Sequence, residues 1–114
     1  MKILLVEDYA SIRTYLSEML QRAGHVVEAV ESLEAAKDAV IQPDVVVSDF
    51  YLDTPDRFET AFDVQRLWPL TPMVVISGAR REDAAFSFEG EWLLKPVLID
   101  ELLGAITRAT GKPA

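Results

Sequence analysis

The feature that most constrains the fold of this chain is a set of short apolar runs that each end in a polar side chain. The central run, residues 44–49, places three valines before Ser48 and Asp49. A short run rich in β-branched residues is typical of a strand buried on both faces, as in a parallel sheet. Asp49 would then lie at the C-terminal end of the strand, which is where open α/β sheets place their ligands.

Three further apolar runs end in charged or hydroxyl side chains, and each also predicts a strand. They are residues 2–6 before Glu7 and Asp8, residues 73–76 before Ser77, and residues 92–94 before Lys95 and Pro96. Residues 25–30 predict a fifth strand, and we expect its first residue, His25, to lie at the surface. Two adjacent acids, a third acid, a hydroxyl and a lysine therefore follow four different predicted strands.

The composition of the 114 residues indicates one globular domain, which we place at residues 1–114. Eleven basic and nineteen acidic residues give a net charge of −8, which opposes binding to nucleic acid. The absence of cysteine excludes disulfides and zinc–thiolate sites, and a single histidine argues against a multi-histidine metal site. No apolar run approaches the length of a membrane span, so we expect a cytoplasmic protein with no membrane partner.

Helical periodicity fills the segments between the predicted strands. The expected helices are residues 12–23 before Gly24, a helix capped by Ser32 with Leu33, Ala36 and Val40 inward, a helix capped by Thr54 with Pro55 in its first turn and its end near Trp68, and residues 100–109. Residues 78–88 carry the weakest helical stripe. Strands and helices thus alternate five times, which indicates a parallel sheet with helices on both faces.

The four strand ends, taken together, resemble those of the receiver domain of two-component response regulators, and the resemblance runs from Met1 to about Arg108. It implies a flavodoxin-like (CheY-like) α/β fold, with a doubly wound five-stranded parallel sheet in the order 2-1-3-4-5. The alternation of strands and helices alone would allow other orders. In the implied order the first and third strands are neighbours, so Glu7, Asp8 and Asp49 would share one pocket.

Three close carboxylates repel one another unless a cation or a proton joins them. Oxygen ligands without histidine or cysteine suit a hard divalent ion such as Mg²⁺. The resemblance assigns Glu7, Asp8, Asp49 and the backbone carbonyl of Tyr51 to a magnesium site, with Glu7 acting through a water molecule. It also implies that Asp49 is the phosphoacceptor, whose carboxylate attacks phosphorus and becomes an acyl phosphate.

Four residues receive further roles from the same resemblance. Lys95 would pair with the phosphoryl oxygens, and the Ser77 hydroxyl would hydrogen-bond one of them. Ser77 and Trp92 stand at the positions of the family's switch pair. At the position of Trp92, tyrosine or phenylalanine is commoner in the family, and the alternative is that Trp92 is a static core residue. The Lys95–Pro96 peptide bond would be cis, and an ordinary loop proline is the alternative.

Two segments depart from the pattern of the family. The loop after Asp49, residues 50–55, is longer than usual and has no glycine. Lys95 follows Ser77 after only 18 positions, and the missing length falls on the fourth helix, which we expect to be shortened. The side chains for phosphoacceptor chemistry are all present, so these departures concern the output surface.

The resemblance implies phosphorelay signalling, in which a histidine kinase or phosphotransfer protein supplies the phosphoryl group and a protein-binding surface responds. The chain would catalyse only its own phosphorylation and dephosphorylation and would otherwise not be an enzyme. One alternative is a phosphate-independent, receiver-like binding module, which the altered loop and short helix favour. A second is a phosphatase of the haloacid-dehalogenase type, which needs an acid two residues after its nucleophile, where this chain has Tyr51.

Overall fold

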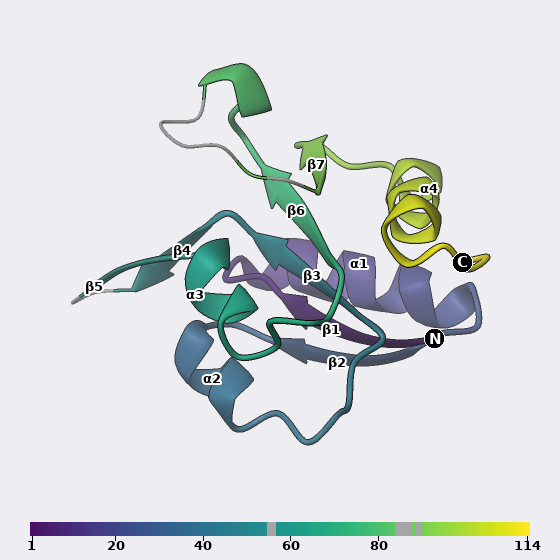
Figure 1. Cartoon of the computed structure of the whole chain (residues 1–114), viewed down its shortest axis with the longest axis horizontal. Coiled ribbons are helices and arrows are strands. Elements are labelled where there is room, and N and C mark those ends of the chain that lie inside the picture. The colour runs from purple at the N-terminus through teal and green to yellow at the C-terminus, as the bar shows by residue number, and fades with distance from the viewer. Residues whose placement is uncertain (55–56, 84–87, 89) are drawn as a thin grey trace.

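The structure is a computed structural model that describes residues 1–54, 57–83, 88 and 90–114. Its main sheet is parallel and has the order β2-β1-β3-β6-β7 (Figure 1). The strands are β1 (Lys2–Val6), β2 (Val26–Val30), β3 (Val45–Asp49), β6 (Met73–Ser77) and β7 (Glu91–Leu94). The predicted order 2-1-3-4-5 is confirmed, with β6 and β7 as the fourth and fifth strands of the sheet.

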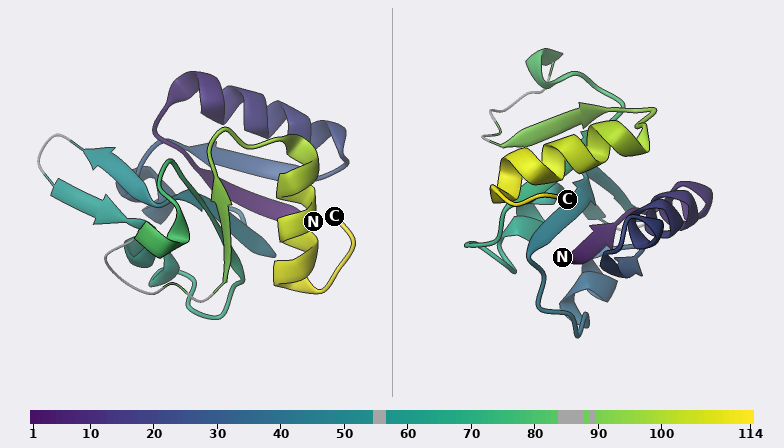
Figure 2. Two further views of the ribbon diagram at one scale, coloured as in Figure 1. Left: turned by 90° about the horizontal axis from the view of Figure 1, so that it is seen from above. Right: turned by 90° about the vertical axis from the view of Figure 1, so that its right-hand side faces the viewer.

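Two helices cover each face of this sheet (Figure 2). The long-helix face carries α1 (Ala10–Arg22) and α4 (Ile99–Thr110), and the short-helix face carries α2 (Leu33–Lys37) and α3 (Ala61–Gln65). Successive strand residues alternate between the two cores: Ile3 and Leu5 pack with the long helices, and Leu4 and Val6 pack with the short ones. The strands are thus buried on both faces, as the continuous apolar runs predict.

The second helix is shorter than its sequence predicts. Ser32 caps it as expected, because its Oγ accepts a hydrogen bond of 3.0 Å from the backbone N–H of Ala35. The helix ends at Lys37, however, and Val40, which we expected to point inward, is 89% exposed. The N–H groups of Val40 and Ile41 donate to Oε1 of Glu28 on β2, so they are held by that side chain.

The prediction that a helix begins after Thr54 is wrong. Two strands, β4 (Tyr51–Thr54) and β5 (Arg57–Thr60), pair as an antiparallel hairpin in this segment, and α3 begins only at Ala61. Pro55, the expected first helical residue, lies outside the described residues. The cap of the helix is Thr60 instead: its Oγ1 accepts from Phe62 N–H, and Asp63 Oδ2 accepts from Thr60 N–H. This reciprocal capping box outweighs the weaker Thr-Pro signal.

The segment between β6 and β7 contains one described helical turn, the 3₁₀ helix η1 (Arg81–Asp83). The remaining residues of the expected fourth helix, 84–87 and 89, lie outside the described residues. The side chain of Arg81 donates a hydrogen bond to the carbonyl of Gly90, which joins η1 to the start of β7. The shortened fourth helix that the spacing predicts therefore stays a prediction.

The expectation that His25 lies at the surface is wrong. His25 is buried, and its Nδ1 lies 2.9 Å from the α-amino nitrogen of Met1. Burial is the largest cause that lowers the pKa of His25, and the positive α-amino group adds to it.

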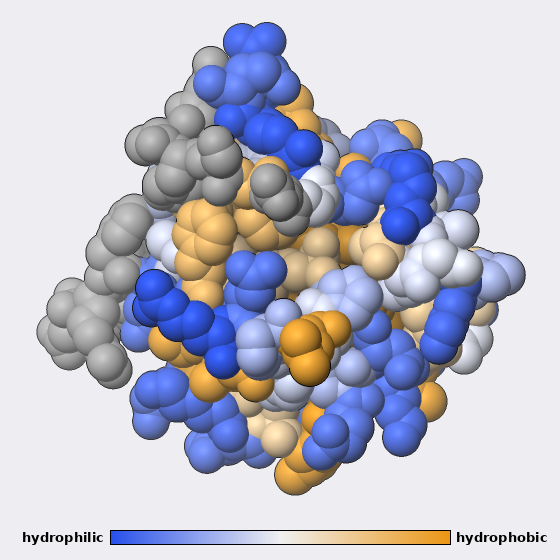
Figure 3. All heavy atoms as spheres, viewed as in Figure 1, coloured by the Kyte–Doolittle hydropathy of each residue, from blue (hydrophilic) through white to orange (hydrophobic). Residues whose placement is uncertain are grey.

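The face shown in Figure 3 is mainly hydrophilic at its periphery, with apolar surface gathered toward its centre. Among the described residues, no helix has the length and apolar character needed to cross a membrane.

Candidate functional site

The C-terminal ends of β1 and β3 bring three carboxylates together. Strand register places Val6 beside Ser48, so the residues that follow, Glu7 and Asp49, emerge at the same edge of the sheet. Glu7, Asp8 and Asp49 each offer an oxygen, and these oxygens lie within 4.8 Å of one another. Glu7 is fully buried and Asp49 is 4% exposed, which makes their mutual repulsion strong.

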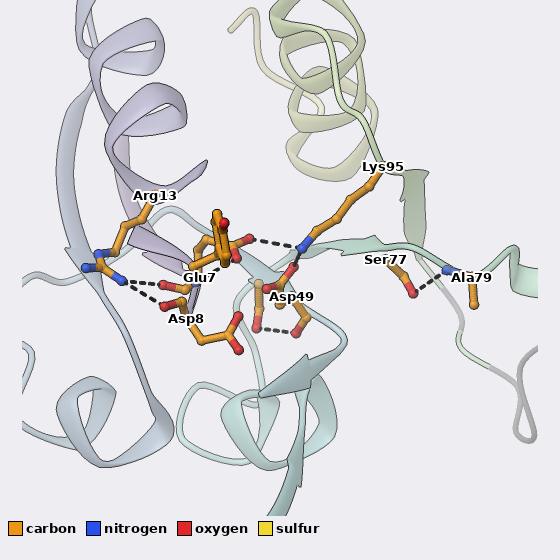
Figure 4. Close-up of polar contacts among 9 residues, drawn as sticks. Glu7, Asp8, Arg13, Asp49, Ser77, Ala79 and Lys95 are labelled. Carbon is orange, nitrogen blue, oxygen red and sulfur yellow. Dashed lines mark hydrogen bonds and ion pairs between the residues drawn. The ribbon is translucent and has the colours of Figure 1, made fainter. Parts of the chain in front are cut away.

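Lys95 reaches into this pocket from the turn that follows β7 (Figure 4). Its Nζ lies 2.7 Å from Oδ1 of Asp49 and 3.4 Å from Oε2 of Glu7. The turn is held beside β6 by a 2.8 Å hydrogen bond from Lys95 N–H to the carbonyl of Ser77. The Lys95–Pro96 peptide bond is cis, as the resemblance implies.

The pocket strongly favours protonation of Asp49. Burial, followed by the hydrogen bond with Glu7, raises the pKa of Asp49 to about 9, although the hydrogen bond from Lys95 opposes this change. Burial by itself would lower the pKa of Lys95, but the hydrogen bond that Lys95 donates to Asp49 and the charges of Asp49 and Glu7 raise this pKa. One lysine therefore does not compensate the acidic cluster, which still favours a proton or a further cation.

Residues 3–107 match the family model of the response regulator receiver domain. The chain belongs to the response regulator receiver domain family. Its match covers the carboxylate cluster, Ser77 and Lys95, which occupy the C-terminal edge of the sheet.

Two curated relatives of this receiver domain are regulatory proteins. It is 31% identical to the DNA-binding transcriptional regulator NtrC of Rhizobium meliloti, over 97% of this chain and 24% of the relative. It is 30% identical to the transcriptional regulatory protein PdtaR of Mycobacterium tuberculosis, over 97% of this chain and 57% of the relative. The chain thus spans between about a quarter and somewhat more than half of the length of these relatives.

Solved receiver structures share the fold. The chemotaxis response regulator CheY4 of Vibrio cholerae superposes with a TM-score of 0.74 at 28% identity, over 95% of this chain and 97% of that one. The N-terminal domain of a response regulator/sensory box/GGDEF 3-domain protein from Carboxydothermus hydrogenoformans gives 0.80 at 19% identity, over 97% and 94%. The second likeness concerns the fold alone.

Ser77 and Trp92, the proposed switch pair of the receiver domain, are joined through one residue. Ser77 Oγ accepts a 3.1 Å hydrogen bond from Ala79 N–H, and the indole N–H of Trp92 donates to the carbonyl of Ala79 at 2.9 Å. The Trp92 ring is partly buried, and its centroid lies 5.2 Å from that of Phe50. The ring therefore already packs on the short-helix core while its N–H holds the turn after β6.

Tyr51 is the predicted residue whose surroundings differ most from those expected. It is the first residue of β4, pairs with Thr60 across the hairpin and is 46% exposed. The hairpin base is closed by a 2.8 Å hydrogen bond from Ala61 N–H to the carbonyl of Phe50. The role of the Tyr51 carbonyl as a metal ligand stays a prediction.

Sequence reasoning missed three hydrogen bonds that hold the turn between β1 and α1. The guanidinium of Arg13 donates to the carbonyls of Glu7 and Asp8, and the N–H of Tyr9 donates to Oε1 of Glu7 at 3.1 Å. Arg13 lies within a helical stripe, and nothing in the sequence pattern separates it from a solvent-facing arginine. Its position five residues after Asp8 was the available signal, because helical side chains lean back toward the N-terminus.

Proposed function

We propose that this receiver domain accepts a phosphoryl group on Asp49 and thereby switches a protein-binding surface. The donor is a phosphohistidine on a histidine kinase or a histidine phosphotransfer protein. The observation that carries the proposal is the joint placement of three carboxylates and Lys95 at one edge of the sheet. Asp49 lies at the centre of this arrangement and is the carboxylate that Lys95 approaches most closely.

The transfer exchanges one bond to phosphorus for another. A carboxylate oxygen of Asp49 attacks the phosphorus, the phosphorus–nitrogen bond of the phosphohistidine breaks, and the leaving imidazole takes up a proton. The product is an acyl phosphate on Asp49. Lys95 then pairs with the phosphoryl oxygens, and the hydroxyl of Ser77 donates to one of them, so that both side chains act on charge that develops during the transfer.

The donor set fits Mg²⁺. Glu7, Asp8 and Asp49 supply only oxygen, and the burial of Glu7 and Asp49 leaves the cluster with a strong preference for added positive charge. Asp8, Asp49 and the carbonyl of Tyr51 would hold the ion, with Glu7 acting through water. When bound, the ion lowers the repulsion between the carboxylates and an incoming phosphoryl group.

The phosphate-independent binding module is not favoured, because the chain retains every acidic and basic side chain that the chemistry needs. The proposal assigns residues 1–114 to one receiver domain with no enzymatic role beyond its own phosphorylation and dephosphorylation. The downstream target is a protein, and neither nucleic acid nor membrane binds this domain directly. We place the domain in the cytoplasm, where kinases obtain ATP.

Mg²⁺-dependent labelling by acetyl phosphate tests the proposal. Intact mass should show one added phosphoryl group on the wild type, and none on Asp49→Ala or in the presence of a chelator. Asp38→Ala removes an exposed acid outside the pocket and should label like the wild type. Equal labelling of Asp49→Ala would refute Asp49 as the acceptor, and turnover of a chromogenic phosphate ester would favour a phosphatase instead.

A further inference from the structure

Arg13 on α1 reaches back over the acidic turn, residues 7–9, that carries two of the three carboxylates (Figure 4). One nitrogen of its guanidinium, Nη1, lies 2.8 Å from the carbonyl oxygen of Glu7 and 3.4 Å from that of Asp8. The first contact is a good hydrogen bond and the second is longer and weaker. Arg13 contacts these residues through their backbones, while their carboxylates face the pocket.

These two carbonyls control the direction of the Asp8 side chain. The carbonyl of Glu7 belongs to the peptide plane before Asp8, and the carbonyl of Asp8 belongs to the plane after it. Because each peptide unit is rigid, holding both planes holds the two backbone dihedrals of Asp8. A guanidinium bound to both carbonyls therefore restricts the direction of the Cα–Cβ bond of Asp8, from which its carboxylate extends.

The ordinary means of fixing such a turn is not used at this helix end. Tyr9 is the N-cap of α1, it makes no side-chain capping hydrogen bond, and the first helical turn has no acidic residue. The turn is tied instead by Glu7, whose N–H donates to the carbonyl of Val30 and whose Oε1 accepts from Tyr9 N–H. The Arg13 side chain links this turn to α1 in addition to the backbone hydrogen bond from Arg13 N–H to the carbonyl of Tyr9.

We propose that Arg13 is a positioning residue, which clamps the acidic turn so that Glu7 and Asp8 present their carboxylates to a divalent cation. The inference rests on the proposed function, because Mg²⁺ is the ion that this function requires. Arg13 does not touch the ion or the phosphoryl group in this role. It acts through the geometry of the residues that do.

Electrostatics alone predicts the opposite effect of removing Arg13. A guanidinium close to a cation site repels the cation, so loss of its charge should strengthen Mg²⁺ binding. Loss of the clamp should weaken Mg²⁺ binding, because Asp8 must then be ordered at the cost of binding energy. The sign of the change therefore separates a positioning role from a mere contribution to local charge.

The test is a calorimetric Mg²⁺ titration of the full chain without any phosphodonor. Arg13→Ala should weaken binding by about tenfold, the scale seen when a group that orients metal ligands is removed. Arg13→Lys keeps the charge but places a single ammonium on a shorter side chain, and should fall between the wild type and Arg13→Ala. Arg22→Ala, which removes an exposed arginine from the other end of α1, should bind Mg²⁺ like the wild type.

A second measurement needs no metal. In chelator, the amide of Tyr9 should exchange its hydrogen faster in Arg13→Ala than in the wild type, while amides of β3 should exchange at unchanged rates. Mg²⁺ binding that is equal or tighter in both Arg13 variants would overturn the positioning role and leave the proposed function intact. Failure of the wild type itself to bind Mg²⁺ would overturn the metal site, and the proposed function with it.

Discussion

The two faces of the sheet are covered by different secondary structure. The long-helix face rests on helices of 13 and 12 residues, each with a sustained apolar stripe. On the short-helix face, two helices of five residues each form the core together with aromatic rings and a hairpin. Long amphipathic helices gain burial along their whole length, whereas short ones depend on caps and on neighbours. We call the long-helix face the regular face, and we call the short-helix face, where the structure departs from the predicted helices, the variable face.

The candidate site draws on both faces. The turns that lead into α1 and α4 on the long-helix face supply Asp8 and Lys95. The segments on the short-helix side supply Tyr51 at the start of the hairpin and Trp92 above the aromatic core. Under the proposed function, we therefore expect substitutions on the regular face to change the binding of metal and phosphate, and substitutions on the variable face to change phosphoryl lifetime and output.

The largest loss of stability should come from substitutions in the two hydrophobic cores. Leu102→Ala in α4 should lower the free energy of unfolding by about 2–5 kcal/mol, because a fully buried side chain leaves a cavity in a rigid frame. Leu52→Ala in β4 removes an equally apolar side chain that is 2% exposed, and should lie near the low end of that range, because a two-stranded ribbon can move inward. Urea denaturation measures both, and equal losses would contradict the division into a rigid and a variable face.

The next effect concerns the pocket where the two faces meet. The raised pKa of Asp49 means that the folded chain binds this proton more tightly than the unfolded chain. Its contribution to stability is therefore complete below the ordinary pKa of 3.8 and is lost as the pH rises toward about 9. In chelator, Asp49→Asn should remove this decline, so that its stability changes less with pH than that of the wild type.

The control for this pH prediction is Asp38→Asn, which alters an exposed acid and should keep the decline of the wild type. Thermal unfolding at several pH values within this window provides the measurement. If the stability of Asp49→Asn declines with rising pH as steeply as that of the wild type, ionisation of Asp49 is not the cause of the decline. Adding Mg²⁺ should stabilise the wild type most at the high end of the window, where Asp49 is ionised.

A smaller effect should follow from Tyr51 on the hairpin. Hydrolysis of an acyl phosphate needs a water molecule in line with the phosphorus, and a bulky ring two residues after Asp49 should obstruct its approach. Tyr51→Asn should therefore shorten the lifetime of the phosphoryl form by a few-fold, and Tyr51→Phe, which keeps the ring, should leave it unchanged. Loss of label after removal of acetyl phosphate measures the rate, and equal rates in all three proteins would exclude the ring as a shield.

The smallest effect should be the optical signal of the switch. Phosphorylation should turn the hydroxyl of Ser77 toward the phosphoryl group, which disturbs its contact with Ala79 and hence the partner of the Trp92 indole. Mg²⁺ with beryllium fluoride should change tryptophan emission in Trp68→Phe and leave it unchanged in Trp92→Phe. Because the Trp92 ring already packs near Phe50, the change should be modest. A signal that follows Trp68 would identify Trp92 as a static core residue.

The regular half of this protein was readable from sequence. Continuous apolar runs predicted β1, β3 and β6 because two-sided burial favours apolar side chains, and an apolar stripe predicted most of α4. The meeting of Glu7, Asp8 and Asp49 followed from one further step, the strand order that the family resemblance implies. Asp8 lies just after β1 and Asp49 is the last residue of β3, so their proximity follows from the neighbouring positions of these parallel strands.

The variable half was decided by tertiary contacts that compete with local signals. Thr54 and Pro55 satisfy the local rules for a helix start, yet the chain pairs β4 with β5, buries Leu52 in the core and delays the helix to the capping box at Thr60. Val40 fits a helical stripe, yet its backbone N–H donates a hydrogen bond to the Glu28 side chain. A local pattern states what a segment can form, and only the burial and hydrogen bonds of its neighbours determine which option has the lower free energy.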